Sequence, residues 1–192
     1  MASKPIRRLA LLRHAKSAWP DLPDHDRPLA GRGRGDAPLM GRWLRDTGWI
    51  PDLVWCSTAE RATQTWRLAA AELGADPPVS YEPRMYGATG GELAALIRQA
   101  PPRMTTLLLV GHNPGIQELA LTLSAAADGD AATAAGDETT AGGHAAAEAL
   151  DRAAAKFPTA AIALLEFGGG WEDLSAGRAR LISFVVPREL GR

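Results

Sequence analysis

Short apolar segments alternate along this chain with longer segments in which apolar residues recur at helical spacing. The run TTLLLV at residues 105–110 predicts the clearest buried strand, and similar runs at 6–12 and 53–56 predict two more. Between the first two runs in the sequence, residues 36–47 carry apolar side chains at three- and four-residue spacing, which predicts a helix. This alternation favours an α/β fold, a three-layer α/β/α sandwich with helices on both faces of a mostly parallel central sheet.

Weaker signals predict the remaining elements. Ser57 or Thr58 is expected to cap a helix that follows the strand at 53–56 and ends at Gly74. Residues 125–150 are rich in Ala, Gly, Thr and Asp and predict a solvated loop or insertion, and an insertion without function is the simpler interpretation. The other predicted elements are a strand at 79–82, a helix at 90–99, a helix after the GHNPG segment, and strands at 160–167 and 180–186.

Length and composition limit the class of protein. The 192 residues suffice for one α/β domain with a real core and are few for two, so a single domain over residues 1–192 is expected. Hydrophobic residues make up 46% and charged residues 22%, which is ordinary for a globular protein and argues against disorder or a membrane protein. A net charge of −1 without a clustered basic face argues against binding to nucleic acid.

Two features bear on the cellular compartment. Cys56 is the only cysteine, so neither an intrachain disulfide nor a multi-cysteine metal site can form, which fits a reducing compartment. The apolar segment that follows the first basic residues spans only residues 9–12 and is too short for a signal-peptide core or a membrane span. We therefore expect a cytoplasmic protein with no membrane partner.

Polar residues follow three of the predicted strands at the point where each strand ends. Arg13 and His14 follow the first strand, Arg61 lies just beyond the second, and His112 follows the strand at 105–110. Ligands of open α/β sheets bind outside the carboxyl ends of the strands. If these strands are parallel neighbours, two histidines and two arginines meet in one pocket.

Those four side chains suit the transfer of a phosphoryl group. Two guanidinium groups offer forked donors for phosphoryl oxygens, and the start of a helix near Arg61 adds backbone N–H donors. A histidine among such cations is held towards its neutral, nucleophilic form. The sequence therefore indicates covalent transfer through a phosphohistidine, with the arginines and the second histidine stabilising charge on the phosphoryl oxygens.

Each residue also has a simpler interpretation. An Arg-His pair can be a solvated strand end, His112 can belong to the turn of the GHNPG segment, and Arg61 can be an ordinary surface residue. Two histidines could instead hold a metal, but no carboxylate or cysteine lies at a ligand spacing beside them, and two arginines would repel a cation. No metal or cofactor is therefore expected, and no role is assigned to His25 or His144.

Several blocks, in this order, resemble a known family. They are LLRHAKSAWPDLPDHDRPLAGRGRGDAPLMGRWL, DLVWCSTAERATQTW, YEPRMYGA, LLLVGHNPGIQELA and FPTAAIALLEF. Together they are similar to the histidine phosphatases of the phosphoglycerate mutase-like superfamily, specifically the small SixA-type phosphohistidine phosphatases. The resemblance covers most of the chain outside residues 125–150 and implies a phosphoglycerate mutase-like fold.

The resemblance also implies a role for individual residues. It places the nucleophile on His14 and the second histidine on His112, with phosphate-binding arginines at Arg13 and Arg61. Glu82, in the YEP block, becomes the candidate for the acid that protonates the leaving group. Ser17 and Ser57 are candidates to donate to a phosphate oxygen, and Arg27 lies in the DRPL segment of such small members, but these three are not assigned a catalytic role.

The same resemblance implies a substrate class and leaves rivals open. The chain lacks the large lid insertion of the mutases and acid phosphatases, so an open pocket is expected, which suits a phosphorylated side chain on another protein. The expected partner is a phosphoprotein that carries phosphohistidine, such as a His-containing phosphotransfer domain. The alternatives are a phosphatase for a small-molecule phosphate and a binding module without catalysis.

Overall fold

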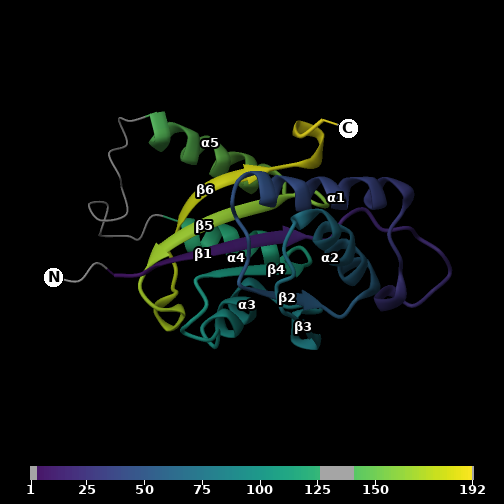
Figure 1. Cartoon of the computed structure of the whole chain (residues 1–192), viewed down its shortest axis with the longest axis horizontal. Helices are drawn as coiled ribbons and strands as arrows, with labels where there is room; N and C mark the ends of the chain where they lie inside the picture. The colour runs from purple at the N-terminus through teal and green to yellow at the C-terminus, as the bar shows by residue number, and fades with distance from the viewer. Residues whose placement is uncertain (1–3, 126–140, 192) are drawn as a thin grey trace.

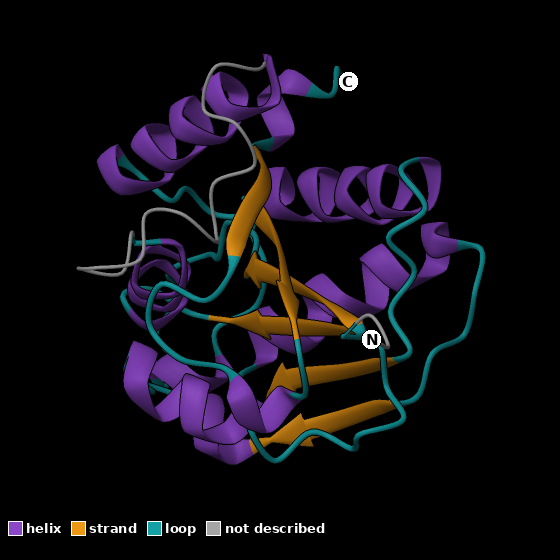
Figure 2. Cartoon of the chain, turned by 90° about the vertical axis from the view of Figure 1, so that its left-hand side faces the viewer, coloured by secondary structure: helices purple, strands orange, loops and turns teal. Residues whose placement is uncertain are grey.

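A computed structural model describes residues 4–125 and 141–191 and builds them around one six-stranded sheet (Figures 1 and 2). The strand order is β3-β2-β4-β1-β5-β6, and β5 pairs antiparallel with both of its neighbours while the other pairs are parallel. The mostly parallel sheet is thereby confirmed. The strands are β1 (Ile6–Arg13), β2 (Leu53–Ser57), β3 (Val79–Glu82), β4 (Thr106–Gly111), β5 (Ile162–Gly168) and β6 (Arg180–Val185).

Helices cover both faces of the sheet, which confirms the three-layer α/β/α arrangement (Figure 2). One face carries α1 (Gly31–Asp46) and α2 (Glu60–Leu73). The other carries α3 (Gly90–Ile97), α4 (Gly115–Ser124) and α5 (Ala141–Ala155). Short 3-10 helices are η1 (Asp24–Asp26), η2 (Pro83–Met85), η3 (Trp171–Asp173) and η4 (Pro187–Glu189).

Strand β1 lies in the middle of the sheet and contributes to the core on both of its faces. Leu9 and Leu11 pack with α3, α4 and α5, whereas Ala10 and Leu12 pack with α1 and α2, because successive side chains of a strand point to opposite faces. All four are at most 1% exposed. Burying each leucine contributes about 1.5–3 kcal/mol, so this apolar run fixes the strand that ends at the polar pair 13–14.

The structure corrects three boundaries. Helix α1 begins five residues before the predicted start at 36, in a Gly/Arg segment without apolar periodicity, where Gly33 packs directly on the backbone of Lys16. Neither Ser57 nor Thr58 caps α2, since Ala59 holds the N-cap position and makes no side-chain cap. The loop predicted over residues 125–150 is wrong for residues 141–150, which belong to α5, and residues 126–140 lie outside the described part.

Helix α5 forms because its alanines favour helix and because its small side chains pack closely. Ala149 and Ala153 are buried in the core cluster on their face of the sheet. Within residues 4–125 and 141–191, no helix is long and apolar enough to span a membrane.

Candidate active site

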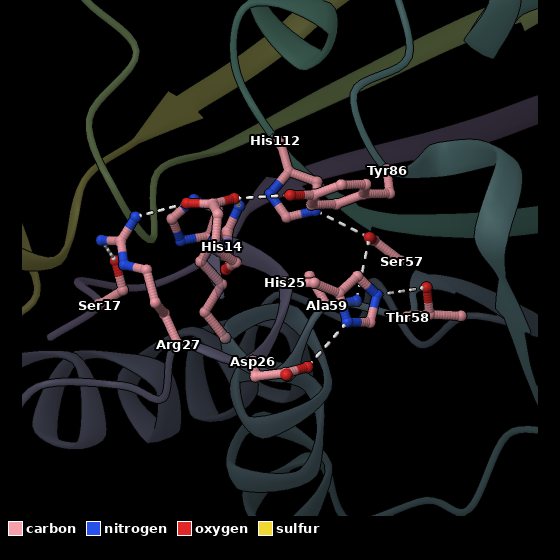
Figure 3. A network of polar contacts seen from close by, with 12 residues as sticks. His14, Ser17, His25, Asp26, Arg27, Ser57, Thr58, Ala59, Tyr86 and His112 are labelled. Atoms are coloured by element: carbon pink, nitrogen blue, oxygen red, sulfur yellow. Dashed lines mark hydrogen bonds and ion pairs between the residues drawn. The ribbon is translucent and has the colours of Figure 1, made fainter. Parts of the chain in front are cut away.

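Three neighbouring strands end at one edge of the sheet and bring the predicted residues together. Strand β1 pairs with β4 so that Arg13 lies opposite Gly111, and the next residue of each strand end is a histidine. The rings of His14 and His112 are 5.1 Å apart between centroids, and both side chains are buried (Figure 3). Arg61 is the second residue of α2, which follows β2. The sheet order therefore places both histidines and both arginines around one point.

His14 is held as a neutral ring with one free nitrogen. Its Nδ1 lies 2.8 Å from the carbonyl oxygen of Ala15. A carbonyl only accepts, so Nδ1 carries the hydrogen and Nε2 keeps its lone pair. Burial, followed by the charges of Arg61, Arg13 and Arg27, lowers the pKa of His14 to about 4, although the Ala15 carbonyl acts in the opposite direction. At neutral pH the ring is thus uncharged, with its lone pair on Nε2.

His112 has one satisfied nitrogen and one without a partner. Its Nε2 lies 2.8 Å from the Ser57 hydroxyl, whose oxygen also accepts a long hydrogen bond from the Ala59 N–H. The hydroxyl hydrogen is therefore available to Nε2, which leaves the ring proton on Nδ1. That nitrogen is buried and has no hydrogen-bond partner among the described residues. Burial, and then the charge that His14 carries once it is protonated in acid, lower the pKa of His112 to about 3, so the ring offers a neutral N–H donor at neutral pH.

A third arginine joins the two that the sequence indicated. Arg27 is 6% exposed, and its Nη2 donates to the Ser17 Oγ at 2.8 Å (Figure 3). Its charge, like those of Arg13 and Arg61, acts on His14. Arg13 uses Nη1 to donate to the Phe157 carbonyl at 2.7 Å, while its Nε is buried without a partner among the described residues. Three guanidinium charges therefore act on His14, and two of them, Arg13 and Arg61, also act on His112.

Asp24 and Tyr86 complete the cluster, and sequence reasoning missed both. The Asp24 carboxylate accepts hydrogen bonds from Arg61, Arg27 and the Tyr86 hydroxyl. The Tyr86 ring lies edge-on to the His112 ring, with 5.6 Å between the ring centroids. The His25 ring also packs edge-on against Tyr86, with 5.0 Å between centroids. The blocks DHDRPL and YEPRMYGA contain these residues, but only the fold brings the two blocks together.

Two other predicted residues have different partners. Ser17 is buried with its Oγ against Arg27, at the margin of the cluster. The Glu82 carboxylate accepts from Arg84 at 2.9 Å and 3.1 Å and lies 3.4 Å from the Ser80 hydroxyl. Within the described chain no hydrogen bond or ion pair joins Glu82 to either histidine. Strand pairing places Glu82 opposite Ser57, the residue whose hydroxyl contacts His112, so its role as the acid stays a prediction.

Two other kinds of chemistry were considered at this edge of the sheet, a reactive cysteine and a bound metal ion. Burial raises the pKa of the Cys56 thiol to about 12, so it is not a thiolate at neutral pH. No group of three or more His, Cys, Asp or Glu side chains within residues 4–125 and 141–191 is placed to hold a metal ion. The cluster is instead rich in cationic donors, which suits an anion.

The fold and the cluster together define a phosphoglycerate mutase-like α/β protein with a buried histidine–arginine cluster. A family model of the Histidine phosphatase superfamily (branch 1) matches residues 9–112. The chain belongs to this superfamily, whose members are phosphatases and mutases. The resemblance found in the sequence motifs is thereby confirmed.

The chain is also similar to individual proteins over nearly its whole length. An uncharacterized protein of Mycobacterium tuberculosis strain H37Rv is 43% identical over 92% of this chain and 100% of its own length. The structure of a candidate phosphohistidine phosphatase SixA from Nakamurella multipartitia superposes with a TM-score of 0.75 at 32% identity, covering 96% of this chain and 98% of that one. A second candidate SixA structure, from Agrobacterium tumefaciens, gives a TM-score of 0.72 at 29% identity, covering 96% of this chain and 100% of that one.

Proposed function

We propose that this protein is a phosphatase that carries the phosphoryl group on His14 and hydrolyses it without a metal ion. The observation that carries the proposal is the state of the His14 ring. It is buried and neutral, its Nδ1 hydrogen is held by the Ala15 carbonyl, its Nε2 has no hydrogen-bond partner among the described residues, and three guanidinium charges act on it. A neutral imidazole beside an anion site is the arrangement that nucleophilic phosphoryl transfer requires.

In the first step the His14 Nε2 attacks phosphorus in line with the leaving group. A P–N bond forms, the bond to the leaving group breaks, and its electron pair departs with the leaving group. The phosphorylated ring becomes cationic, and its Nδ1–H strengthens its hydrogen bond to the Ala15 carbonyl. Arg13, Arg61 and the free Nδ1–H of His112 stabilise charge on the phosphoryl oxygens.

In the second step water attacks the phosphorus of phospho-His14. The P–Nε2 bond breaks, its electron pair returns to the ring, and one water proton passes to solvent as inorganic phosphate leaves. His14 regains its neutral form with the hydrogen on Nδ1. Because guanidinium groups already supply positive charge at the oxygens, neither step calls for a divalent cation.

We assign the substrate to phosphohistidine on a protein, such as a His-containing phosphotransfer domain, because both carboxylates considered as acids, Asp24 and Glu82, are paired with arginines in the described part of the chain. The Tyr86 hydroxyl and then Arg27 hold the pKa of Asp24 well below its usual range, so Asp24 stays ionised, and Glu82 pairs with Arg84. A phosphorylated imidazole whose distal nitrogen is protonated departs as neutral imidazole and needs no proton at the breaking bond. An alkyl phosphate would need one. The likeness to candidate SixA proteins supports the same class.

A substrate panel tests this assignment. The purified chain is assayed in EDTA against a phosphohistidine-bearing phosphotransfer domain, phosphoramidate, sugar phosphates and nucleotides. We expect kcat/KM for the phosphohistidine protein to exceed that for any phosphate ester by about tenfold or more. Faster turnover of a sugar phosphate or nucleotide would replace the assigned substrate by a small metabolite. Tight phosphate binding without any turnover would identify a binding module instead.

A further inference from the structure

The Asp24 carboxylate occupies donors that belong to the candidate phosphoryl site. Its Oδ2 accepts from Arg61 Nη2 at 2.9 Å and from the Tyr86 hydroxyl at 2.7 Å, and its Oδ1 accepts from Arg27 Nη1 at 2.7 Å. The carboxylate side chain is 52% exposed, whereas the two guanidinium side chains are 9% and 7% exposed. Asp24 therefore lies between two buried cations and solvent.

Those two cations act on the proposed nucleophile as well as on Asp24. The charges of Arg61 and Arg27 both lower the pKa of His14, so both guanidinium groups lie within electrostatic reach of the reacting nitrogen. A guanidinium fork matches a carboxylate and a phosphoryl group by the same paired hydrogen bonds. The donors that Asp24 uses are consequently donors that a bound phosphoryl group would need.

We propose that Asp24 is a specificity-determining residue that occupies the phosphoryl donors of Arg27 and Arg61 in the free protein and is displaced by the phosphoryl group of the substrate. This inference rests on the proposed function, since it takes the same cluster as the phosphoryl site. A tethered carboxylate acts at a high effective concentration, so an anion displaces it only by binding the guanidinium groups more strongly than a carboxylate does. Weakly bound monoanions such as carboxylates are then excluded, while a phosphoryl dianion with three acceptor oxygens still binds.

The place of Asp24 in the fold permits this displacement. It begins the 3-10 helix η1, in the irregular segment between β1 and α1, and none of the three residues of η1 is buried. A single exposed turn has few packed contacts to lose when its first side chain reorients. The same competition weakens the binding of the product phosphate and so favours its release.

Calorimetric titration with inorganic phosphate tests the proposal on the wild-type chain and two variants. Asp24→Asn removes the competing charge, and we expect its Kd for phosphate to be about tenfold lower than that of the wild type. Asp26→Asn is the matched control. It removes the same charge from the same turn, but Asp26 contacts His25 rather than the arginines. Its Kd should stay within about twofold of the wild type, because an exposed charge without a direct contact is largely screened.

A third variant tests whether the effect of Asp24→Asn comes from a local change of structure. Tyr86→Phe keeps the ring against His112 but removes the hydroxyl that donates to Asp24, so phosphate should again bind more tightly, by a smaller factor. Unchanged or weaker binding in Asp24→Asn, with the wild type still binding phosphate, would overturn the inference and leave the proposed function standing. Absence of phosphate binding in all the proteins would overturn both.

Discussion

At the scale of single residues, the two histidines are distinguished by what holds their second nitrogen. His14 gives its Nδ1 hydrogen to a backbone carbonyl, which keeps Nε2 free for attack. His112 uses Nε2 against the Ser57 hydroxyl, which keeps the hydrogen on Nδ1 for an anion. In the proposed mechanism, two chemically identical side chains thus obtain different roles, nucleophile and donor, from one hydrogen bond each.

Ser57→Ala tests the second of these assignments. Without the hydroxyl, the His112 ring loses the partner that fixes its tautomer, and a lost hydrogen bond of about 1.4 kcal/mol corresponds to about a tenfold fall in kcat. Steady-state kinetics on phosphoramidate measures the effect. Thr58→Ala is the control, because the Thr58 hydroxyl contacts His25 rather than His14 or His112. An equal loss in both variants would speak against a specific role for Ser57.

The two buried histidines also set a pH dependence of stability. In the unfolded chain both have an ordinary pKa of 6.5, whereas in the folded protein burial lowers the values to about 4 and about 3. The unfolded chain therefore binds more protons between these values, and the free energy of unfolding falls as the pH falls from 6.5 towards 4. Urea unfolding at pH 7 and pH 5 should show a loss of about 2 kcal/mol for each histidine. His14→Asn should lose about half of this dependence, and an unchanged slope would contradict the buried neutral state.

At the scale of the elements, the site depends on how closely α1 and α2 approach each other. A Cβ added to Gly41 of α1 would lie 1.9 Å from the carbonyl oxygen of Ala69 in α2, so only glycine fits at this crossing. Helix α2 begins with the segment that carries Arg61, while α1 follows the segment that carries Asp24 and Arg27. The crossing therefore helps to set the distance between the guanidinium groups of the cluster.

Gly41→Ala should destabilise the protein by about 2–4 kcal/mol, because the backbone of a packed helix has to move. Gly35→Ala provides the control within the same helix. A Cβ at Gly35 meets nothing within 4 Å, so this alanine should leave stability unchanged or raise it by about 0.5–1 kcal/mol. Chemical denaturation of both variants makes the comparison. Equal stability would show that α1 and α2 do not pack as described.

At the scale of the whole molecule, the apolar runs and their ends predicted the strands of the sheet better than local composition predicted the helices. The runs at 6–12 and 105–110 predicted buried strands, because continuous burial leaves a strong apolar signal. The structure places both in the middle of the sheet and brings the residues after them together. The sequence predicted neither the start of α1 nor α5. Their glycines and alanines carry no apolar periodicity, and close packing rather than hydrophobic bulk fixes them.

The part of the candidate site that directly follows strands could be predicted from the sequence, and the part that comes from irregular segments could not. The pairing of β1 with β4 fixes the positions of the residues that come immediately after these strands, His14 and His112. Asp24, Arg27 and Tyr86 come from irregular segments, and their meeting depends on long-range contacts that no local pattern records. Glu82 was selected by its block alone, and its pairing with Arg84 became visible only in the folded chain.

The covalent intermediate on His14 is the most direct test of the proposed mechanism. The chain is mixed with a substrate labelled with ³²P on its phosphoryl group, quenched within milliseconds, and mapped by peptide analysis. We expect a label that is stable in base, labile in acid and confined to the peptide that contains His14, and absent from His14→Ala. Turnover at the wild-type rate in His14→Ala, or a label on another residue, would contradict the assignment of His14 as the nucleophile.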